Sequence, residues 1–193
     1  AVGAYTESRK GAVYVYVRNG GVWTQQQKLT ASNAEAGDQF GYSVAIAGET
    51  IVVGAFGEDS GSDGVNGDQA GTGVFVVGAA YVFTRSGTAW TQQAYLKASN
   101  SDEGDQFGYS VAIAGETIVV GADREDSGSD GVNGNQGNGA NDAGAAYVFT
   151  RSGSTWSQQA YLKASNSDGG DEFGVSVAIA GETIVVGANS EDS

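Results

Sequence analysis

A unit of 45 residues occurs three times along this chain of 193 residues, and no other feature restricts its fold as strongly. The copies, at 11–55, 78–122 and 144–188, align without a gap, and the second and third differ at only six positions. Repetition at such a period indicates one supersecondary unit that is used again and again, each copy contacting its neighbours. We therefore expect a series of like units.

Within each unit, apolar residues alternate or run in short β-branched stretches between glycine-rich turns, which is typical of strands. In the second unit we predict strands at 80–84, 90–97, 108–114 and 117–121. Ser86-Gly87 and Gly115-Glu116 are expected to form tight turns, and 98–105 a longer polar connection. The predicted fold class is all-β, with three tandem four-stranded antiparallel units of the size of propeller blades. Because propellers close with about four to eight blades, the units belong to a larger propeller or to an open repeat array.

The segments outside the units have a different composition. Two inserts, 56–77 and 123–143, are rich in Gly, Asp, Asn and Ser. Such a composition provides no core of its own, so we expect an external tie such as a metal ion to order these inserts. We interpret residues 1–10 as the tail of a preceding repeat with a short junction, and 189–193 as the start of a further insert.

The composition excludes several classes of function. With 9 Lys and Arg against 23 Asp and Glu, the net charge of −14 disfavours nucleic acid and anionic membrane surfaces as partners and favours divalent cations. The absence of Cys and His excludes disulfides, thiol nucleophiles, Ser-His-Asp triads and ordinary zinc, copper or haem sites. The apolar runs are too short to span a bilayer, so no membrane insertion is expected. Carboxylates in repeated, similar loops lack the unequal environments of a catalytic pair, so we expect no enzyme.

Two motifs recur in phase with the units. A Gly-Asp-x-Phe-Gly motif begins at Gly37, Gly104 and Gly170, and a Thr-Ile-Val-Val-Gly-Ala stretch follows it each time. In these motifs the chain resembles the FG-GAP repeat family over nearly its whole length. The resemblance implies the β-propeller of integrin α subunits and many bacterial surface proteins, an extracellular or cell-surface location, and calcium in loops. Integrin-type repeats carry their calcium loop between these two motifs, but here only Ala114-Gly115-Glu116-Thr117 and its copies link them, so that site is not carried over.

Calcium is predicted instead in the inserts. Asp59-Ser60-Gly61-Ser62-Asp63-Gly64 and its copy from Asp126 place acids at the first and fifth positions and Gly at the sixth, a spacing that wraps a loop around a hard cation. The twelfth position lacks the usual bidentate Glu. The predicted calcium ligands are Glu58, Asp59, Asp63 and Asp68 in the first insert, Glu125, Asp126, Asp130 and Asn133 in the second, and Asp192 near the end of the chain. The alternative is a pair of solvated acidic loops that promote solubility.

A second acidic cluster precedes each Phe-Gly pair. Its recurring members are Asp38, Asp105 and Asp171. If adjacent units stack, these residues come round at regular spacing and can bind one ion per junction. The alternative, which we favour, is that they cap turns through local backbone hydrogen bonds.

The recurring aromatic and polar strand residues suggest packing roles. Six tyrosines and phenylalanines are expected to pack between sheets: Tyr14, Tyr16, Tyr81, Phe83, Tyr147 and Phe149. We expect Trp23, Trp90 and Trp156 to pack between neighbouring sheets, each with its indole N–H bonded to backbone. The glutamines that follow each Trp are expected to be exposed. Arg85 and Arg151 are expected to form surface ion pairs with neighbouring acids.

These observations favour a non-catalytic extracellular structural or scaffolding protein, a calcium-stabilised array of repeats in a surface layer, adhesin stalk or filament. Its partners are then copies of itself or adjoining repeats of a longer chain. The alternative is part of a ligand-binding propeller that recognises a protein or glycan in cell adhesion.

Overall fold

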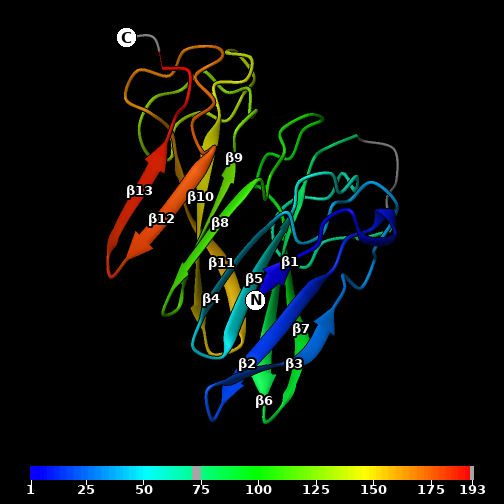
Figure 1. Cartoon of the computed structure of the whole chain (residues 1–193). Helices are drawn as coiled ribbons and strands as arrows, with labels where there is room; N and C mark the ends of the chain where they lie inside the picture. Colours follow the sequence, from blue (N-terminus) through cyan, green and yellow to red (C-terminus); the bar gives the residue numbers. More distant parts are fainter. Residues whose placement is uncertain (71–74, 192–193) are drawn as a thin grey trace.

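The computed structural model describes residues 1–70 and 75–191, and in these ranges the chain is all-β apart from the single 3₁₀ turn η1 (Glu7–Arg9). The strands form four antiparallel sheets (Figure 1). The first sheet contains β1 (Val2–Gly3), β2 (Val13–Asn19) and β3 (Val22–Leu29). The second contains β4 (Ser43–Ala47), β5 (Thr50–Ala55), β6 (Ala79–Ser86) and β7 (Ala89–Leu96). The third contains β8 (Ser110–Ala114), β9 (Thr117–Ala122), β10 (Ala145–Ser152) and β11 (Thr155–Leu162), and the last contains β12 (Ser176–Ala180) and β13 (Thr183–Gly187).

The predicted strands of the second unit are confirmed. β6, β7, β8 and β9 coincide with them to within two residues at each end. The expected tight turns are also present, with Gly87 at φ +64° and Gly115 at φ +56°. Both turns need a left-handed backbone conformation that glycine adopts without steric cost.

The sheets are offset from the sequence units, so one unit is not one sheet. The first two strands of a unit lie in one sheet and its last two lie in the next, as β6–β7 and β8–β9 illustrate. The insert joins β5 to β6, which pair from Thr50↔Thr84 to Ala55↔Ala79, whereas the polar connection after β7 crosses to the third sheet. A complete sheet therefore needs strands from two consecutive units.

A close backbone approach ties neighbouring sheets together at the start of each unit. Gly78 forms a parallel bridge with Phe107, and Gly11 with Phe40 and Gly144 with Phe173 repeat it. Gly78 has φ +87°, and a Cβ added there would overlap the carbonyl oxygen of Phe107. The Gly at the start of the unit and the Phe of the Phe-Gly pair are thus two halves of one contact.

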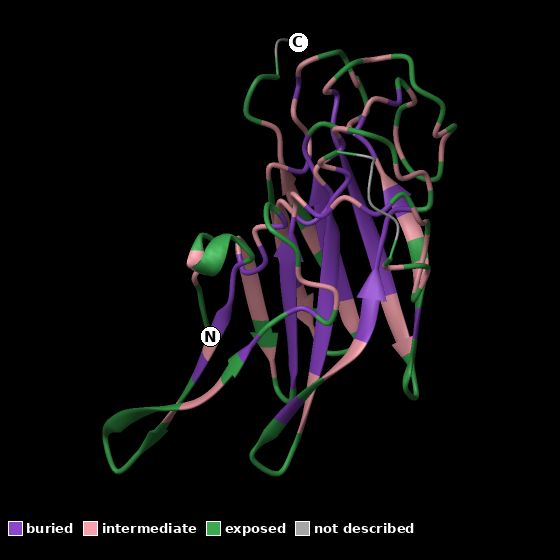
Figure 2. Cartoon of the chain, turned by 90° about the vertical axis from the view of Figure 1, so that its right-hand side faces the viewer, coloured by how far each residue is buried: buried purple, intermediate pink, exposed green. Residues whose placement is uncertain are grey.

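The core lies between the sheets, because each complete sheet has two apolar faces. Tyr81 and Phe83 of β6 face the first sheet and pack on Phe40, with ring centroids 5.4 and 5.9 Å apart. Between the second and third sheets, Tyr147 and Phe149 repeat this arrangement around Phe107. Buried residues are concentrated along the strands of the sheets (Figure 2). The expected inter-sheet packing of aromatic residues is confirmed at these positions.

The tryptophans behave differently at the start of the chain and inside it. Trp90 and Trp156 are 4% and 3% exposed, but Trp23 is 66% exposed on the outer face of the first sheet, so its predicted burial was wrong. The indole Nε1 of Trp90 donates to Gln26 Oε1 (2.9 Å), and that of Trp156 to Gln93 Oε1 (3.0 Å). The partner is therefore a glutamine of the preceding sheet, which we had expected to be exposed, rather than backbone.

The sheets converge at their inner strands. β4 lies beside β8 and β8 beside β12, and contacts between neighbouring sheets are most extensive there. Ser43 Oγ donates to the carbonyl of Gly108, and Ser110 Oγ to that of Gly174. The inserts and the long connections gather at one end of the sheets and the tight turns at the other (Figure 1).

Replacing Gly78 with Ala should lower the free energy of unfolding by more than about 3 kcal/mol, because the new Cβ overlaps Phe107 and the backbone angle is unfavourable. Denaturant unfolding measures this loss. The matched control is Gly87→Ala, at φ +64° with no atom within 4 Å of the added Cβ. We expect that variant to lose only about 1 kcal/mol. Equal losses in the two variants would contradict the role given to the Gly78–Phe107 contact.

Candidate functional site

Each insert begins with a buried ion pair. Glu58 Oε2 lies 3.1 Å from Lys97 Nζ, and both side chains are at most 2% exposed. Lys97 also donates to the carbonyl of Ser60 (2.7 Å), so its ammonium ties the insert to the end of β7. Burial lowers the pKa of Lys97, and the neighbouring Glu58 carboxylate opposes that effect. In the next sheet, Glu125 and Lys163 repeat the pair at 3.0 Å.

Hydrogen bonds from the preceding unit complete this buried network. Asn33 Nδ2 donates to Glu58 Oε1 (3.0 Å), and Tyr81 OH donates to Asn33 Oδ1 (2.8 Å). Ser60 Oγ contacts both Glu58 and Tyr95 OH. The equivalents around Glu125 are Asn100, Tyr147, Ser127 and Tyr161. The Glu58 carboxylate therefore links the polar connection after β3 to the first insert, and through Asn33 and Ser60 it is linked to the tyrosines of β6 and β7.

The lysine of this network was missed in the sequence, although a signal was present. Lys97 and Lys163 precede the long polar connections, but the first unit has Thr30 at that position. In the junction before the first unit, Glu7 stands where Glu58 does in the first insert, and it pairs at 2.5 Å with Lys28, whose side chain is 42% exposed. Lysine is thus present at this position in the two units that follow a long insert.

The predicted calcium ligands of the inserts hold the loops by hydrogen bonds. Their carboxylate or amide oxygens accept backbone N–H groups: Asp63 from Ser101 (3.0 Å), Asp68 from Ala70 (2.9 Å), Asp126 from Asp142 (2.8 Å), Asp130 from Ser167 (2.9 Å) and Asn133 from Tyr161 (2.9 Å). Residue 65 forms an isolated bridge with Leu96, and Val132 forms one with Leu162. The inserts therefore lie against the outer strands β7 and β11.

The carboxylates before the Phe-Gly pairs cap turns, which confirms the turn-capping role that we favoured from the sequence. Asp38, Asp105 and Asp171 are at most 2% exposed, and each Oδ2 accepts the N–H of the residue three positions earlier. Burial raises the pKa of Asp38 to about 6, and the charges of Glu58 and Asp59 add to this. Burial raises the pKa of Asp105 to about 8 in the same way.

The arrangement of these acidic side chains shows how well they suit a calcium ion. Asp38 lies near Glu58 and Asp59, but the Glu58 oxygens are already occupied by Lys97, Ser60 and Asn33. Within residues 1–70 and 75–191, no three acidic side chains are grouped in a way that suits a metal ion. Asp192 lies outside the described residues. Calcium binding by these residues stays a prediction.

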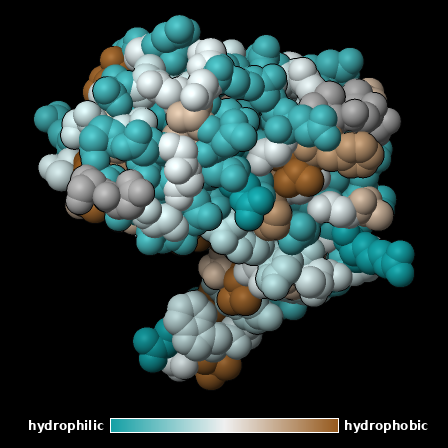
Figure 3. All heavy atoms as spheres, turned by 90° about the horizontal axis from the view of Figure 1, so that it is seen from above, coloured by the Kyte–Doolittle hydropathy of each residue, from teal (hydrophilic) through white to brown (hydrophobic). Residues whose placement is uncertain are grey.

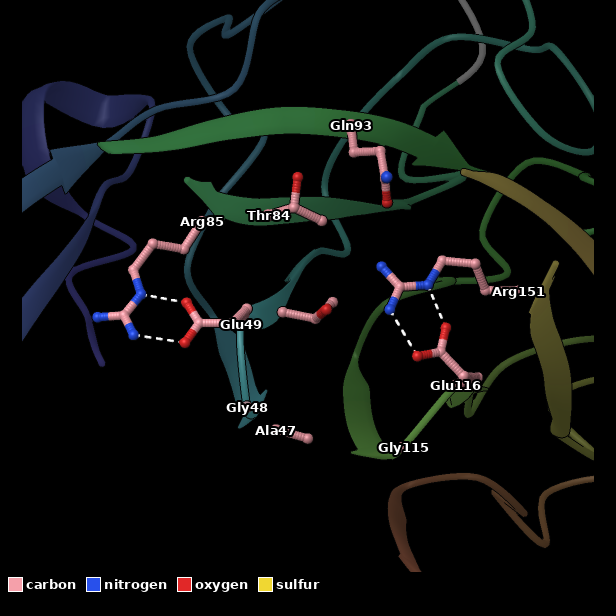
Figure 4. A pocket seen from close by; sticks show the side chains of 10 residues that line it. Ala47, Gly48, Glu49, Thr84, Arg85, Gln93, Gly115, Glu116 and Arg151 are labelled. Carbon is pink, nitrogen blue, oxygen red and sulfur yellow. Dashed lines mark hydrogen bonds and ion pairs between the residues drawn. The ribbon is translucent and has the colours of Figure 1, made fainter. Parts of the chain in front are cut away.

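A groove lies at the turn end between the second and third sheets (Figure 4). Its volume is about 490 Å³, and its charged lining consists of the pairs Arg85–Glu49 and Arg151–Glu116. Both pairs are bidentate, which confirms the ion pairs predicted for these arginines. Because each cation is matched by a carboxylate, the groove has no net charge from these residues.

Substitution of Lys97 by Met should lower the free energy of unfolding by about 3 kcal/mol, because Glu58 then remains buried without a counter-charge. The double variant Lys97→Met with Glu58→Gln should recover part of the loss. Lys28→Met, which breaks the exposed pair, is the matched control and should lose much less. Similar losses at the two lysines, measured by denaturant unfolding, would contradict the network described above.

The buried carboxyl of Asp105 predicts a pH dependence. Its folded-state pKa of about 8 lies above the unfolded value of about 4, so only the folded state keeps the proton between these values. The stability contributed by this group therefore falls as pH rises through that window. With a chelator present to exclude metal effects, Asp105→Asn should be more stable than wild type by up to about 5 kcal/mol at pH 8 and show no advantage near pH 4. Asp68→Asn, an exposed change of equal charge, is the control; an identical profile for it would refute the assignment.

The FG-GAP repeat profile matches residues 23–83, 90–149 and 156–193. No significant match to a curated protein was found. FG-GAP repeats are typical of extracellular proteins, and no helix in the described part of the chain is long and apolar enough to cross a bilayer. The matched segments cover most of the chain and carry the repeated strands, aromatic contacts and polar networks described above, and the chain therefore belongs to the FG-GAP repeat family.

Proposed function

We propose that this chain is a non-catalytic structural repeat domain of an extracellular or cell-surface protein, in which the units form an array that serves a surface layer, adhesin stalk or filament. The observation that carries the proposal is the equivalence of the junctions. The Glu58–Lys97 network recurs around Glu125 and Lys163 with the same partners and nearly the same distances. Equivalent junctions are what a load-bearing array needs, since each unit then contacts its neighbours in the same way.

The placement of the charged groups supports a structural role. Deeply buried carboxylates such as Glu58, Glu125 and Asp171 accept hydrogen bonds from lysine, asparagine or backbone groups of the same chain. The inserts and connections form the end of the molecule seen in Figure 3, where hydrophilic side chains predominate. In the proposed array this polar end faces solvent.

Calcium is part of this proposal. Burial is the main reason that the pKa of Asp38 is raised, and the charges of the nearby Glu58 and Asp59 add to it, so like charges lie close together at this junction. A divalent cation at this place would relieve that repulsion, with oxygen ligands of the kind that calcium prefers. Some of the present hydrogen bonds, such as that from Asn33 to Glu58, would then have to be exchanged for metal contacts.

A partly exposed aromatic cluster supports the second candidate function, a propeller that binds a protein or glycan. Tyr42 packs on Tyr5, Phe56 and Tyr109, with ring centroids 5.3, 4.5 and 5.0 Å apart. Tyr5 is 42% exposed. The third unit has Val175 in place of the tyrosine, so the cluster distinguishes one part of the array from the rest, as a recognition site would.

Thermal unfolding with millimolar calcium, compared with excess chelator, tests the calcium-stabilised array. A cation that binds only the folded state raises the midpoint according to its affinity, and a hundredfold excess over the dissociation constant adds about 3 kcal/mol. We expect the unfolding midpoint to be higher in calcium than in chelator. Asp38→Asn should lower the midpoint more in calcium than in chelator. Magnesium is the control ion. Equal midpoints in calcium and chelator would reject calcium and leave the inserts as solubility features.

A further inference from the structure

One side-chain contact is repeated between the first and second sheets and between the second and third sheets. The tryptophan of the later sheet is buried, and its Nε1 donates to a glutamine of the earlier one: Trp90 to Gln26, and Trp156 to Gln93. Arg85 and Arg151 cover these indole rings at 5.7 and 5.3 Å. Gln26, Gln93 and Gln159 occupy the same position in the three units.

The outer face of the first sheet carries the tryptophan half of this contact without a partner. Trp23 is 66% exposed there, and Tyr16 is 40% exposed, whereas its counterparts Phe83 and Phe149 are 3% and 0% exposed. Arg18, the counterpart of Arg85, forms no ion pair among the described residues. This face is therefore built like a buried interface although it faces solvent.

The opposite end of the molecule carries the glutamine half. A groove of about 310 Å³ lies beside β12 and β13 and is lined by Gln159, Ile179 and Glu182, among others. It corresponds to the groove of Figure 4, in which Arg151 pairs with Glu116. At this end Glu182 stands in the place of Glu116, and it forms no ion pair within the described part of the chain.

The backbone edges are complementary as well. The last sheet has only β12 and β13, so one edge of β13 is unpaired within the described residues. In the first sheet, β1 pairs with β2 only at Val13 and Tyr14, and its Val2 is 58% exposed. Residues 15–17 of β2 therefore lack a partner strand on the side of β1.

We propose that β12–β13 of one chain docks on β2–β3 of a second copy and completes a four-stranded sheet, with β13 taking the place of β1. This rests on the proposed function, since it treats the units as an array. The register of β5 and β6, in which Thr50 pairs with Thr84, places Thr183 opposite Val17 of the other copy. If the new sheet is built in the same way as the second sheet, Trp23 of the second copy lies beside Gln159 of the first. Arg18 of the second copy then lies beside Glu182 of the first. A second copy is the occupant because each end of this chain carries the side chains that the other end lacks.

The arrangement of the sheets indicates whether a series of such contacts forms a closed ring. Two copies provide two complete sheets each and share two more, which gives six, within the range of about four to eight blades of closed propellers. A head-to-tail contact forms a ring when the rotation closes and an open series when it does not. Convergence of the inner strands β4, β8 and β12 favours the ring.

The test measures the mass of the full chain by light scattering and sedimentation over a wide range of concentrations, in calcium and in chelator. We expect a species of twice the 19.5 kDa chain mass, or a longer series. Trp23→Ala should weaken association by about thirtyfold or more. Val22→Ala is the matched control: Val22 is 64% exposed, but its counterparts Ala89 and Thr155 remain exposed inside the array, so this change should have no effect.

A charge exchange tests the direction of the contact. Arg18→Glu and Glu182→Arg should each weaken self-association by about fivefold, because like charges then meet. Mixing the two variants should restore association, because both junctions of a mixed dimer again pair opposite charges. Two chains that associate through a different contact would not regain association when the variants are mixed.

The outcomes separate this contact from the proposed function. A folded monomer at every concentration, or association that neither Trp23→Ala nor the charge exchange alters, would overturn the head-to-tail contact. If that monomer still gains stability in calcium, the array within a single chain stands. If association follows the expected pattern but calcium has no effect, the contact stands and the calcium-stabilised array does not.

Discussion

Face-to-face packing of sheets is the interaction on which the rest of this structure depends. The second sheet directs Tyr81 and Phe83 toward the first sheet and Val82 toward the third, so neither of its faces is suited to solvent. A sheet of this kind is stable only between two neighbours, since apolar burial is the main favourable contribution to folding. The glutamine–tryptophan contact and the Gly78–Phe107 bridge then fix how far and in which register the neighbours approach.

The polar networks solve a different problem, the anchoring of inserts that are rich in Gly, Asp, Asn and Ser. We expected an external tie for them. Lys97, which directly follows the edge strand β7 of the same sheet, ties the first insert through Glu58 and Ser60. Buried ion pairs seldom add much net stability compared with apolar residues, but an unpaired partner is costly. This network therefore specifies where the insert lies.

The first unit illustrates how the network depends on the insert. Its junction is short, Glu7 pairs with Lys28 near the surface, and Thr30 replaces the buried lysine. The side chains of a junction thus change together, which is the behaviour of a structural contact rather than of a separate binding site. The aromatic cluster around Tyr42 differs in another way, because the third unit has Val175 in place of the tyrosine.

The sequence by itself determined the local structure. Strand positions, the turns at Gly87 and Gly115 and the capping roles of Asp38, Asp105 and Asp171 follow from alternation, backbone preference and hydrogen bonds over a few residues. The repeat also indicated that aromatic residues pack between sheets.

Only the tertiary structure decided which strands share a sheet and which side chains meet across it. Pairing of β5 with β6 crosses a long insert, and Glu58 and Lys97 lie 39 positions apart, so no local pattern encodes either contact. The three tryptophans occupy equivalent positions in sequence, yet Trp90 is buried and Trp23 exposed, because burial depends on whether another sheet lies against that face. The repeat specifies which side chains each unit can use to contact a neighbour. Only the tertiary structure determines which of these side chains are buried by a neighbouring sheet.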